Sequence, residues 1–229
     1  MARMARVVVP GMPHHVTQRG NRRMQTFFCE EDYRAYLWLV VQWCGRHGVA
    51  IWTYCLMPNQ VQLILVPPGE GALAQAVGEA HRRYTRRVNF REGWRGHLWQ
   101  ERFASFAMDE GYLLAAARYV EMNPVEAGLA RRPEDWAWSS AAAHIAGRPD
   151  AVAEGQWPAE RTAGWVCTWG EFLMQGHEDG FAESMGRHER SGRPLGDTPF
   201  LRRLERLLGR ALVPRKPGRR RKSQSDNEK

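Results

Sequence analysis

The sequence lacks the long apolar runs and the paired cysteines that would assign it to a membrane class, a zinc-binding class or a disulfide-rich class. A membrane span needs roughly 20 consecutive apolar residues, and the 229 residues contain no such run. The four cysteines form no CxxC pair, which disfavours a zinc site and a disulfide framework. The apolar patch near the N-terminus is too short for a signal peptide. We therefore expect a cytoplasmic protein without membrane contact.

Acidic residues are in deficit. The chain has 25 Asp and Glu against 33 Lys and Arg, which gives a formal net charge of +8 and a pI of about 9.8. Such a balance favours a polyanionic partner. Residues 133–200 hold 5 basic and 11 acidic groups, whereas residues 201–222 hold 10 basic groups and 1 acidic group. We expect a basic domain (1–147), an acidic connecting segment (148–200), and an amphipathic helix with a basic disordered tail (201–229).

Hydrophobic periodicity predicts alternating strands and helices up to residue 122. Strands are predicted over 6–19, 49–56, 60–66 and 98–107, and helices over 31–46, 72–89 and 109–122. The last helix has a suitable N-cap in Asp109 and should end before Pro124. The order β-α-β-β-α-β followed by a helix indicates an α+β fold, a ferredoxin-like antiparallel sheet with packed helices.

The strand at 60–66 carries two glutamines within an otherwise apolar segment, LMPNQVQLILV. Side chains of a strand point alternately to its two faces. Val61 and Leu63 should therefore lie on one face. Gln60, Gln62 and Ile64 should lie on the other. Taken alone, the two glutamines are half-exposed polar residues on the solvated side of a sheet.

Four motifs occur in one order on this scaffold: PHHVTQRGNRR (13–23), YCLMPNQVQLILV (54–66), GHLWQERFASF (96–106) and ARYVEMNPVEAGL (117–129). Together they resemble the single-tyrosine transposases of the IS200-like superfamily, especially the REP-associated tyrosine transposases. WAWSSAAAH (136–144) and GRPLG (192–196) extend the resemblance toward the C-terminus. The resemblance implies an HUH nuclease-like domain that acts on single-stranded DNA.

The resemblance also implies a mechanism and its residues. In this family, a His-hydrophobic-His motif holds a divalent metal, Mg²⁺ or Mn²⁺, and a tyrosine attacks the scissile phosphate to form a phosphotyrosine intermediate. The two histidine positions fall on Gln60 and Gln62, the catalytic tyrosine on Tyr119, and a further metal-ligand position on Asn123. Three neutral amides supply no negative charge and no imidazole nitrogen. We therefore expect metal binding and cleavage to be impaired, whether the glutamines are natural or engineered.

Several of these residues also have ordinary structural roles open to them. Tyr119 lies on a helical stripe, where a tyrosine can simply pack with its hydroxyl near water. His14 and His15 are adjacent on a strand, so only one of them can face a metal site. For both we expect a hydrogen-bonded core or surface histidine. His81 and His97 are weak candidates for the same reason.

Two arginine clusters indicate the partner. The segment QRGNRR places Arg19, Arg22 and Arg23 around a Gly-Asn turn that can present guanidinium groups to phosphates. The segment HRRYTRR places Arg82, Arg83, Arg86 and Arg87 on one helix, away from its apolar stripe. With the basic tail, these clusters favour single-stranded or hairpin DNA as the partner of a nucleoid-associated protein, with a homodimer as an open possibility.

The sequence leaves three functions open. The first is an active transposase that uses amide ligands or an unrecognised histidine. The second is a DNA-binding regulator without catalytic activity. The third is a protein that binds structured RNA through the same basic clusters. We expect a DNA-binding protein of the tyrosine transposase type, with DNA cleavage and strand transfer impaired by the loss of the metal-binding histidines.

Overall fold

The computed structural model describes residues 5–153 and 168–213. The chain divides into two compact units, residues 1–196 and residues 197–229. The second unit contains α8 (Thr198–Leu208), where the Asp197 carboxylate caps the helix by accepting a hydrogen bond from the Phe200 amide at 2.7 Å. The basic tail at 214–229 lies outside the described residues. Among the described helices, none combines the length and the apolar character of a membrane span.

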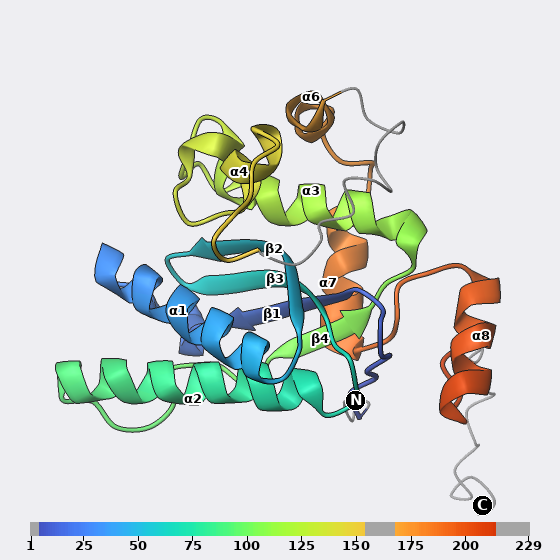
Figure 1. Ribbon diagram of the computed structural model, residues 1–229, viewed down its shortest axis with the longest axis horizontal. Helices are drawn as coiled ribbons and strands as arrows, with labels where there is room; N and C mark the ends of the chain where they lie inside the picture. The colour runs from blue at the N-terminus through green and yellow to red at the C-terminus, as the bar shows by residue number, and fades with distance from the viewer. Residues whose placement is uncertain (1–4, 154–167, 214–229) are drawn as a thin grey trace, which may run out of the picture. The chain divides into compact units, whose positions relative to one another are not determined.

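The first unit begins with the expected order of strands and helices (Figure 1). These elements are β1 (His14–Arg19), α1 (Glu30–Arg46), β2 (Ala50–Met57), β3 (Gln60–Val66), α2 (Ala72–Glu92), β4 (Ala104–Ala107) and α3 (Glu110–Glu126). The α+β class is confirmed. β4 is shorter than expected, because residues 98–100 bond instead to the end of β1 and to the turn that follows it. The Asn21 amide donates to the Leu98 carbonyl, and the Gln100 amide donates to the Arg19 carbonyl.

The four strands form one antiparallel sheet in the order β2-β3-β1-β4. β1 therefore lies between β3 and β4. The register of β1 against β3 places Thr17 opposite Gln62 and Arg19 opposite Gln60. Because residues directly opposite each other share a face of the sheet, this register decides which side chains of β1 meet the glutamines.

Different helices cover the two faces of the sheet (Figure 1). α1 and α2 pack on one face, and their core includes Val61, Leu63 and Leu65 of β3. α3 lies on the other face, where Ile64 packs in a second core that also contains Met185 of α7 (Phe181–Ser191). The expected alternation along β3 is confirmed, and the glutamine face of the sheet is the one that α3 covers.

Pro124 does not end α3, contrary to our expectation. The helix continues to Glu126 with the proline in its last turns. A proline removes one backbone donor and crowds the carbonyl four residues before it. In the same turn, Asn123 Nδ2 donates to the Tyr119 carbonyl oxygen at 2.6 Å, and the Ala127 amide donates to the Asn123 carbonyl at 2.9 Å. These two bonds support the turn that the proline weakens.

The segment that we expected to be a connection contains helices that the sequence patterns did not separate. They are α6 (Trp169–Met174) and α7, and α4 (Ala141–Ile145) precedes them. A buried carboxylate on α3, that of Glu121, joins α4 and α6 to the sheet domain. It accepts hydrogen bonds from Ser140 Oγ at 2.6 Å, from His144 Nδ1 at 2.5 Å and from Trp169 Nε1 at 2.7 Å.

Candidate nucleic-acid interface and catalytic site

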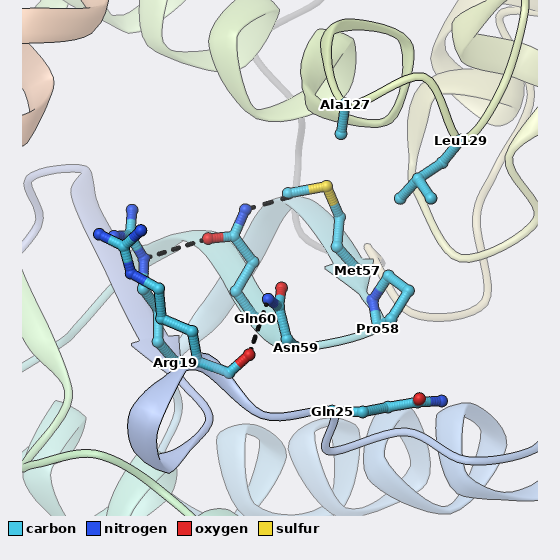
Figure 2. A pocket seen from close by; sticks show the side chains of 9 residues that line it. Arg19, Gln25, Met57, Pro58, Asn59, Gln60, Ala127 and Leu129 are labelled. Carbon is cyan, nitrogen blue, oxygen red and sulfur yellow. Dashed lines mark hydrogen bonds between the residues drawn. The ribbon is translucent and has the colours of Figure 1, made fainter.

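Gln60 and Gln62 lie on the α3 face of β3, but their surroundings differ. Gln62 is only 2% exposed, and its Oε1 lies 3.3 Å from Nε2 of His15, which donates to it. Gln60 is half-buried, and its Oε1 accepts a hydrogen bond from Arg19 Nε at 3.1 Å (Figure 2). Its Nε2 makes only a weak contact with the Met57 sulfur at 3.8 Å. The half-exposed position considered for both glutamines therefore applies to Gln60 alone.

His15 is buried and neutral at pH 7, because burial lowers its pKa to about 4. When Nε2 donates to Gln62, Nδ1 becomes an acceptor, and it has no hydrogen-bond partner. The neighbouring acid is Glu189 of α7. One oxygen of this carboxyl lies 4.0 Å from His15 Nδ1, and the other lies 3.7 Å from a guanidinium nitrogen of Arg19. Burial raises the pKa of Glu189, and the positive charge of Arg19 only partly offsets this effect.

Tyr119 of α3 faces the same region. Its ring centroid lies 6.1 Å from that of His15, 5.7 Å from that of His177 and 6.2 Å from that of Phe181. Burial raises the pKa of Tyr119 to about 12, and the nearby Glu189 acts in the same direction. The phenol is therefore neutral at pH 7, and it needs a base or a metal to become a nucleophile. Tyr119 packs among aromatic rings and also lies near the glutamine pair.

The turn after β1 holds two arginines in an uncommon backbone conformation. Arg22 and Arg23 have φ values of 52° and 61°, in the left-handed region that costs a non-glycine residue about 1–2 kcal/mol. Gly20 permits the close turn, since a Cβ there would lie 2.1 Å from the Met24 carbonyl oxygen. Asn59 Nδ2 donates to the Arg23 carbonyl at 3.1 Å. Both arginine side chains are exposed, and strained backbone held in place by its surroundings is typical of functional sites.

A cavity of about 610 Å³ opens beside this turn, between the β2–β3 connection and the end of α3 (Figure 2). Its lining residues are Arg19, Arg23, Gln25, Met57, Pro58, Asn59, Gln60, Ala127 and Leu129. Two guanidinium groups and three carboxamides contribute to this lining, and it contains no carboxylate. Such a set of donors suits the oxygens of a phosphate group.

The four arginines of the HRRYTRR segment in α2 do not act alike. Arg82 and Arg83 both contact Glu79, with nitrogen–oxygen distances of 2.7 Å and 3.5 Å. Arg86 and Arg87 are exposed and form no ion pair within 4.0 Å among the described residues. Within this segment, Arg86 and Arg87 are therefore the two arginines whose charge is free to contact a phosphate.

Three other histidines lie where we expected. His14 Nε2 accepts a hydrogen bond from the Val9 amide at 3.1 Å, and its Nδ1 lies 2.8 Å from the Met12 carbonyl. His81 Nε2 lies 2.8 Å from the Tyr36 hydroxyl within the core. His97 is exposed. None of the three contacts the glutamine pair.

Comparison with known proteins identifies the family and the fold. The family model described as "Transposase IS200 like" matches residues 8–123, which is half of the chain. The chain belongs to the IS200-like transposase family. The fold matches that of a REP-associated tyrosine transposase solved with a REP hairpin, at 20% identity and a TM-score of 0.56, over 69% of this chain and 93% of that chain. A search of curated proteins gives no significant match.

A second solved structure, a Deinococcus radiodurans protein described as a transposase, is 18% identical over 52% of this chain and 95% of that chain, with a TM-score of 0.38. Membership of the IS200-like family makes this chain a transposase-type DNA-binding protein. The family and the α+β fold expected from the sequence are confirmed.

The residues at the positions that the family resemblance assigns to the metal, Gln60, Gln62 and Asn123, do not fit a divalent metal. Chemistry in this family depends on such a metal, yet the described residues contain no group of three or more His, Cys, Asp or Glu side chains able to hold one. The carboxamide oxygens of Gln60 and Gln62 already accept hydrogen bonds from Arg19 and His15. The guanidinium adds positive charge, which repels a cation. Asn123 directs its amide nitrogen to the backbone of its own helix.

Two residues near the transposase centre were missed by sequence reasoning, Glu189 and His177. His177 Nε2 lies 2.9 Å from Glu126 Oε1, and its ring faces Tyr119. Both residues follow the four central motifs, in a segment without clear periodicity. The signal that could have found them is GRPLG, because Leu195 of that motif donates its amide to the Ala107 carbonyl at 2.8 Å and so brings the end of α7 to β4.

Proposed function

We propose that this transposase-type protein binds single-stranded or hairpin DNA, and that metal-dependent cleavage is lost or strongly reduced. The observation that carries the proposal is the pair of hydrogen bonds that engage Gln60 and Gln62, at the positions where the family resemblance places metal ligands. The structural relative solved with a REP hairpin supports a hairpin as the form of the DNA. Tyr119 is, on this proposal, the former nucleophile.

The proposed binding mode places a DNA phosphate in the cavity beside Gln60. Arg19 and Arg23 contribute guanidinium groups to that cavity, and the Gln60 carboxamide nitrogen is held only by a weak contact to sulfur. Hydrogen-bond donors can hold a phosphate in place without generating a nucleophile from a phenol that burial keeps neutral. Binding without cleavage follows from this donor set.

A titration of a labelled DNA hairpin in EDTA at fixed salt tests the proposal. Replacing Arg22 and Arg23 together by alanine should weaken binding by about 10- to 100-fold for each charge-assisted hydrogen bond that is removed. Tyr119→Phe removes one hydroxyl, keeps the ring, and should leave the affinity within a few-fold. It serves as the matched control for a change at the centre. Loss of binding in EDTA, or a larger effect of Tyr119→Phe than of the arginine pair, would contradict the proposal.

Two further assays separate the competing functions. Incubation of the hairpin with Mg²⁺ or Mn²⁺ should produce no cleaved product above background, because the glutamine oxygens are already engaged. Robust cleavage would assign the chain to the active transposases. Competition between equal lengths of DNA hairpin and structured RNA should favour DNA. A preference for RNA would replace the proposed partner.

A further inference from the structure

An aromatic patch lies at one end of the α1–α2 helix pair, which covers the sheet face opposite to that of Gln60 and Gln62. Its members are Phe28, which precedes α1, Phe90 in the last turns of α2, and Trp94, which follows α2. They are 39%, 91% and 44% exposed. The N-terminus of α1 and the C-terminus of α2 lie at the same end of this antiparallel pair (Figure 1). Aromatic rings of this size are normally buried, so three exposed ones within one small region are unusual.

The patch is held rigidly. The rings of Phe28 and Trp94 meet edge to face, with centroids 5.7 Å apart and an angle of 80°. The Trp94 amide donates to the Asn89 carbonyl at 2.9 Å, and Asn89 Nδ2 donates to the Gly96 carbonyl at 2.9 Å. The reversal of the chain between them uses Gly93 in the left-handed conformation. The rings of Phe28 and Trp94 are therefore held in place by these contacts.

An ion pair joins α1 and α2 at the end of the helix pair that carries the patch. Arg91 Nη2 donates to Asp32 Oδ2 at 3.0 Å, and the Arg91 guanidinium lies 5.7 Å from the centre of the Phe28 ring. Arg91 also binds Glu92, so this carboxylate is already neutralised. The ion pair holds α1 against α2 and keeps Phe28 beside the end of α2.

Unpaired positive charge lies on the α2 side of the patch, whereas Glu30 and Glu31 on the α1 side are paired with Arg34. Arg86, Arg87 and Arg95 are exposed and form no ion pair within 4.0 Å among the described residues. Glu92, the carboxylate nearest to them in the chain, is bound to Arg91. A protein partner for an apolar patch would have to neutralise these charges. A nucleic acid supplies both the negative backbone and the planar bases that stack on aromatic rings.

The patch is also joined to the arginine turn after β1. The Asn21 amide donates to the Leu98 carbonyl at 2.8 Å, and the Tyr84 hydroxyl of α2 donates to the Thr26 carbonyl at 2.6 Å. The turn is followed directly by the segment that carries Phe28. Phe28 lies five positions after Arg23 in the chain, which is at most about 18 Å of extended backbone, so one strand of DNA can contact both the turn and the patch.

We propose that Phe28, Phe90 and Trp94 form a stacking platform for unpaired bases next to the hairpin stem. The proposal rests on the proposed DNA-binding function and adds a binding subsite to it. The arginine turn and the cavity beside Gln60 hold the phosphate backbone. The platform holds bases, and it gives the protein a preference for hairpins that carry a single-stranded extension.

The test compares a blunt hairpin, the same hairpin with an oligothymidine extension on the 5′ or the 3′ side, and the same extensions built from abasic nucleotides. The unaltered protein should bind one extended hairpin about 5- to 100-fold more tightly than the blunt one for each base that stacks. The abasic extension should recover only a small part of this gain, because it keeps the phosphates and removes the bases.

The variants Phe90→Ala and Phe90→Ala with Trp94→Ala should lose the gain from the extension while binding the blunt hairpin normally. Phe90 is 91% exposed, so its replacement leaves the core intact, and thermal melting checks this. Trp38→Ala is the matched control. Trp38 is 62% exposed on α1, and Arg34, one turn before it, is paired with Glu30 and Glu31. This variant should keep the full gain.

The outcomes are separable from those of the binding proposal. If no hairpin binds, the proposed function fails. If the blunt hairpin binds but no extension helps, or the abasic extension helps equally, or the Phe90 and Trp94 variants keep the gain, the stacking platform is refuted. A dimer of the unaltered protein in sedimentation, converted to a monomer by Phe90→Ala, would assign the patch to a second copy of the chain and also refute it.

Discussion

Acid should destabilise this protein well above the pH at which carboxylates titrate, because three histidines are buried in the neutral form. Burial lowers the pKa of His14 and of His15 to about 4 and that of His81 to about 3, from 6.5. The unfolded chain therefore binds more protons than the folded chain between these values and 6.5. Stability is complete above pH 6.5 and is lost as the pH falls through this window.

The magnitude follows from the pKa differences. A difference of one pKa unit corresponds to about 1.4 kcal/mol, so protonation of His14 or His15 can lower the unfolding free energy by about 3 kcal/mol each, and protonation of His81 by about 5 kcal/mol. At pH 5 each of the three histidines has lowered the unfolding free energy by about 2 kcal/mol, which is about 6 kcal/mol together. The unfolding free energy of a typical domain is about 5–15 kcal/mol in total. Burial also lowers the pKa values of His177 and His188, which add to the loss, whereas Glu189, with its raised pKa, opposes it by at most one proton. Asp32, with its lowered pKa, acts below the window.

The assay is guanidinium unfolding followed by tryptophan fluorescence at several pH values between 7.5 and 5. The unaltered protein should lose roughly 6 kcal/mol of unfolding free energy over this range. His81→Gln cannot titrate and should reduce the slope by about one third, even though poorer packing lowers its stability at pH 7.5. His97→Gln, at an exposed position, is the matched control. A loss below about 1 kcal/mol between pH 6.5 and pH 5, or an unchanged slope in His81→Gln, would refute the reasoning.

The remaining predictions concern the metal site, the turn and the tail. Replacing both Gln60 and Gln62 by histidine should restore some Mn²⁺ binding by calorimetry and some hairpin cleavage; no metal binding by this variant would place the defect elsewhere, in Glu189 and Arg19. Gly20→Ala should lower both the thermal midpoint and the hairpin affinity, because its Cβ would lie 2.1 Å from a carbonyl oxygen, whereas Gly78→Ala meets open space on α2 and should lower neither. Deleting residues 214–229 should flatten the plot of log affinity against log salt by nearly one for each DNA phosphate that the tail neutralises in the unaltered protein, and an unchanged slope would show that the tail does not touch the bound DNA.

The sequence predicted the sheet well, because alternation along a strand is a local property. The faces of Val61 and Gln62 follow from the period of two. The family motifs indicated that the helix carrying Tyr119 lies next to this strand. The position of Glu189 was missed because it depends on how α7 packs against β4, and the GRPLG motif at the end of α7 is the one local signal of that packing. The end of α3 was placed wrongly because a side-chain bond from Asn123 supports the turn at Pro124.

The pairing of Arg82 and Arg83 with Glu79 could have been predicted from the sequence. Glu79 precedes Arg82 and Arg83 by three and four residues, the spacing at which side chains meet on a helix. Counting arginines alone treated four charges as equivalent, although the two that follow Glu79 are paired. The neutral state of His15 could not be predicted from the sequence, because it depends on the burial of this side chain in the folded protein.

The backbone of the turn after β1 sets stability and function against each other. Arg22 and Arg23 occupy a conformation that glycine or asparagine would adopt at lower cost. Random mutagenesis followed by selection for heat resistance alone should therefore enrich glycine or asparagine at these two positions. The survivors would melt at higher temperature and bind DNA more weakly. On the proposed function, replacing these arginines during stability engineering would remove the DNA contacts that the strained turn presents.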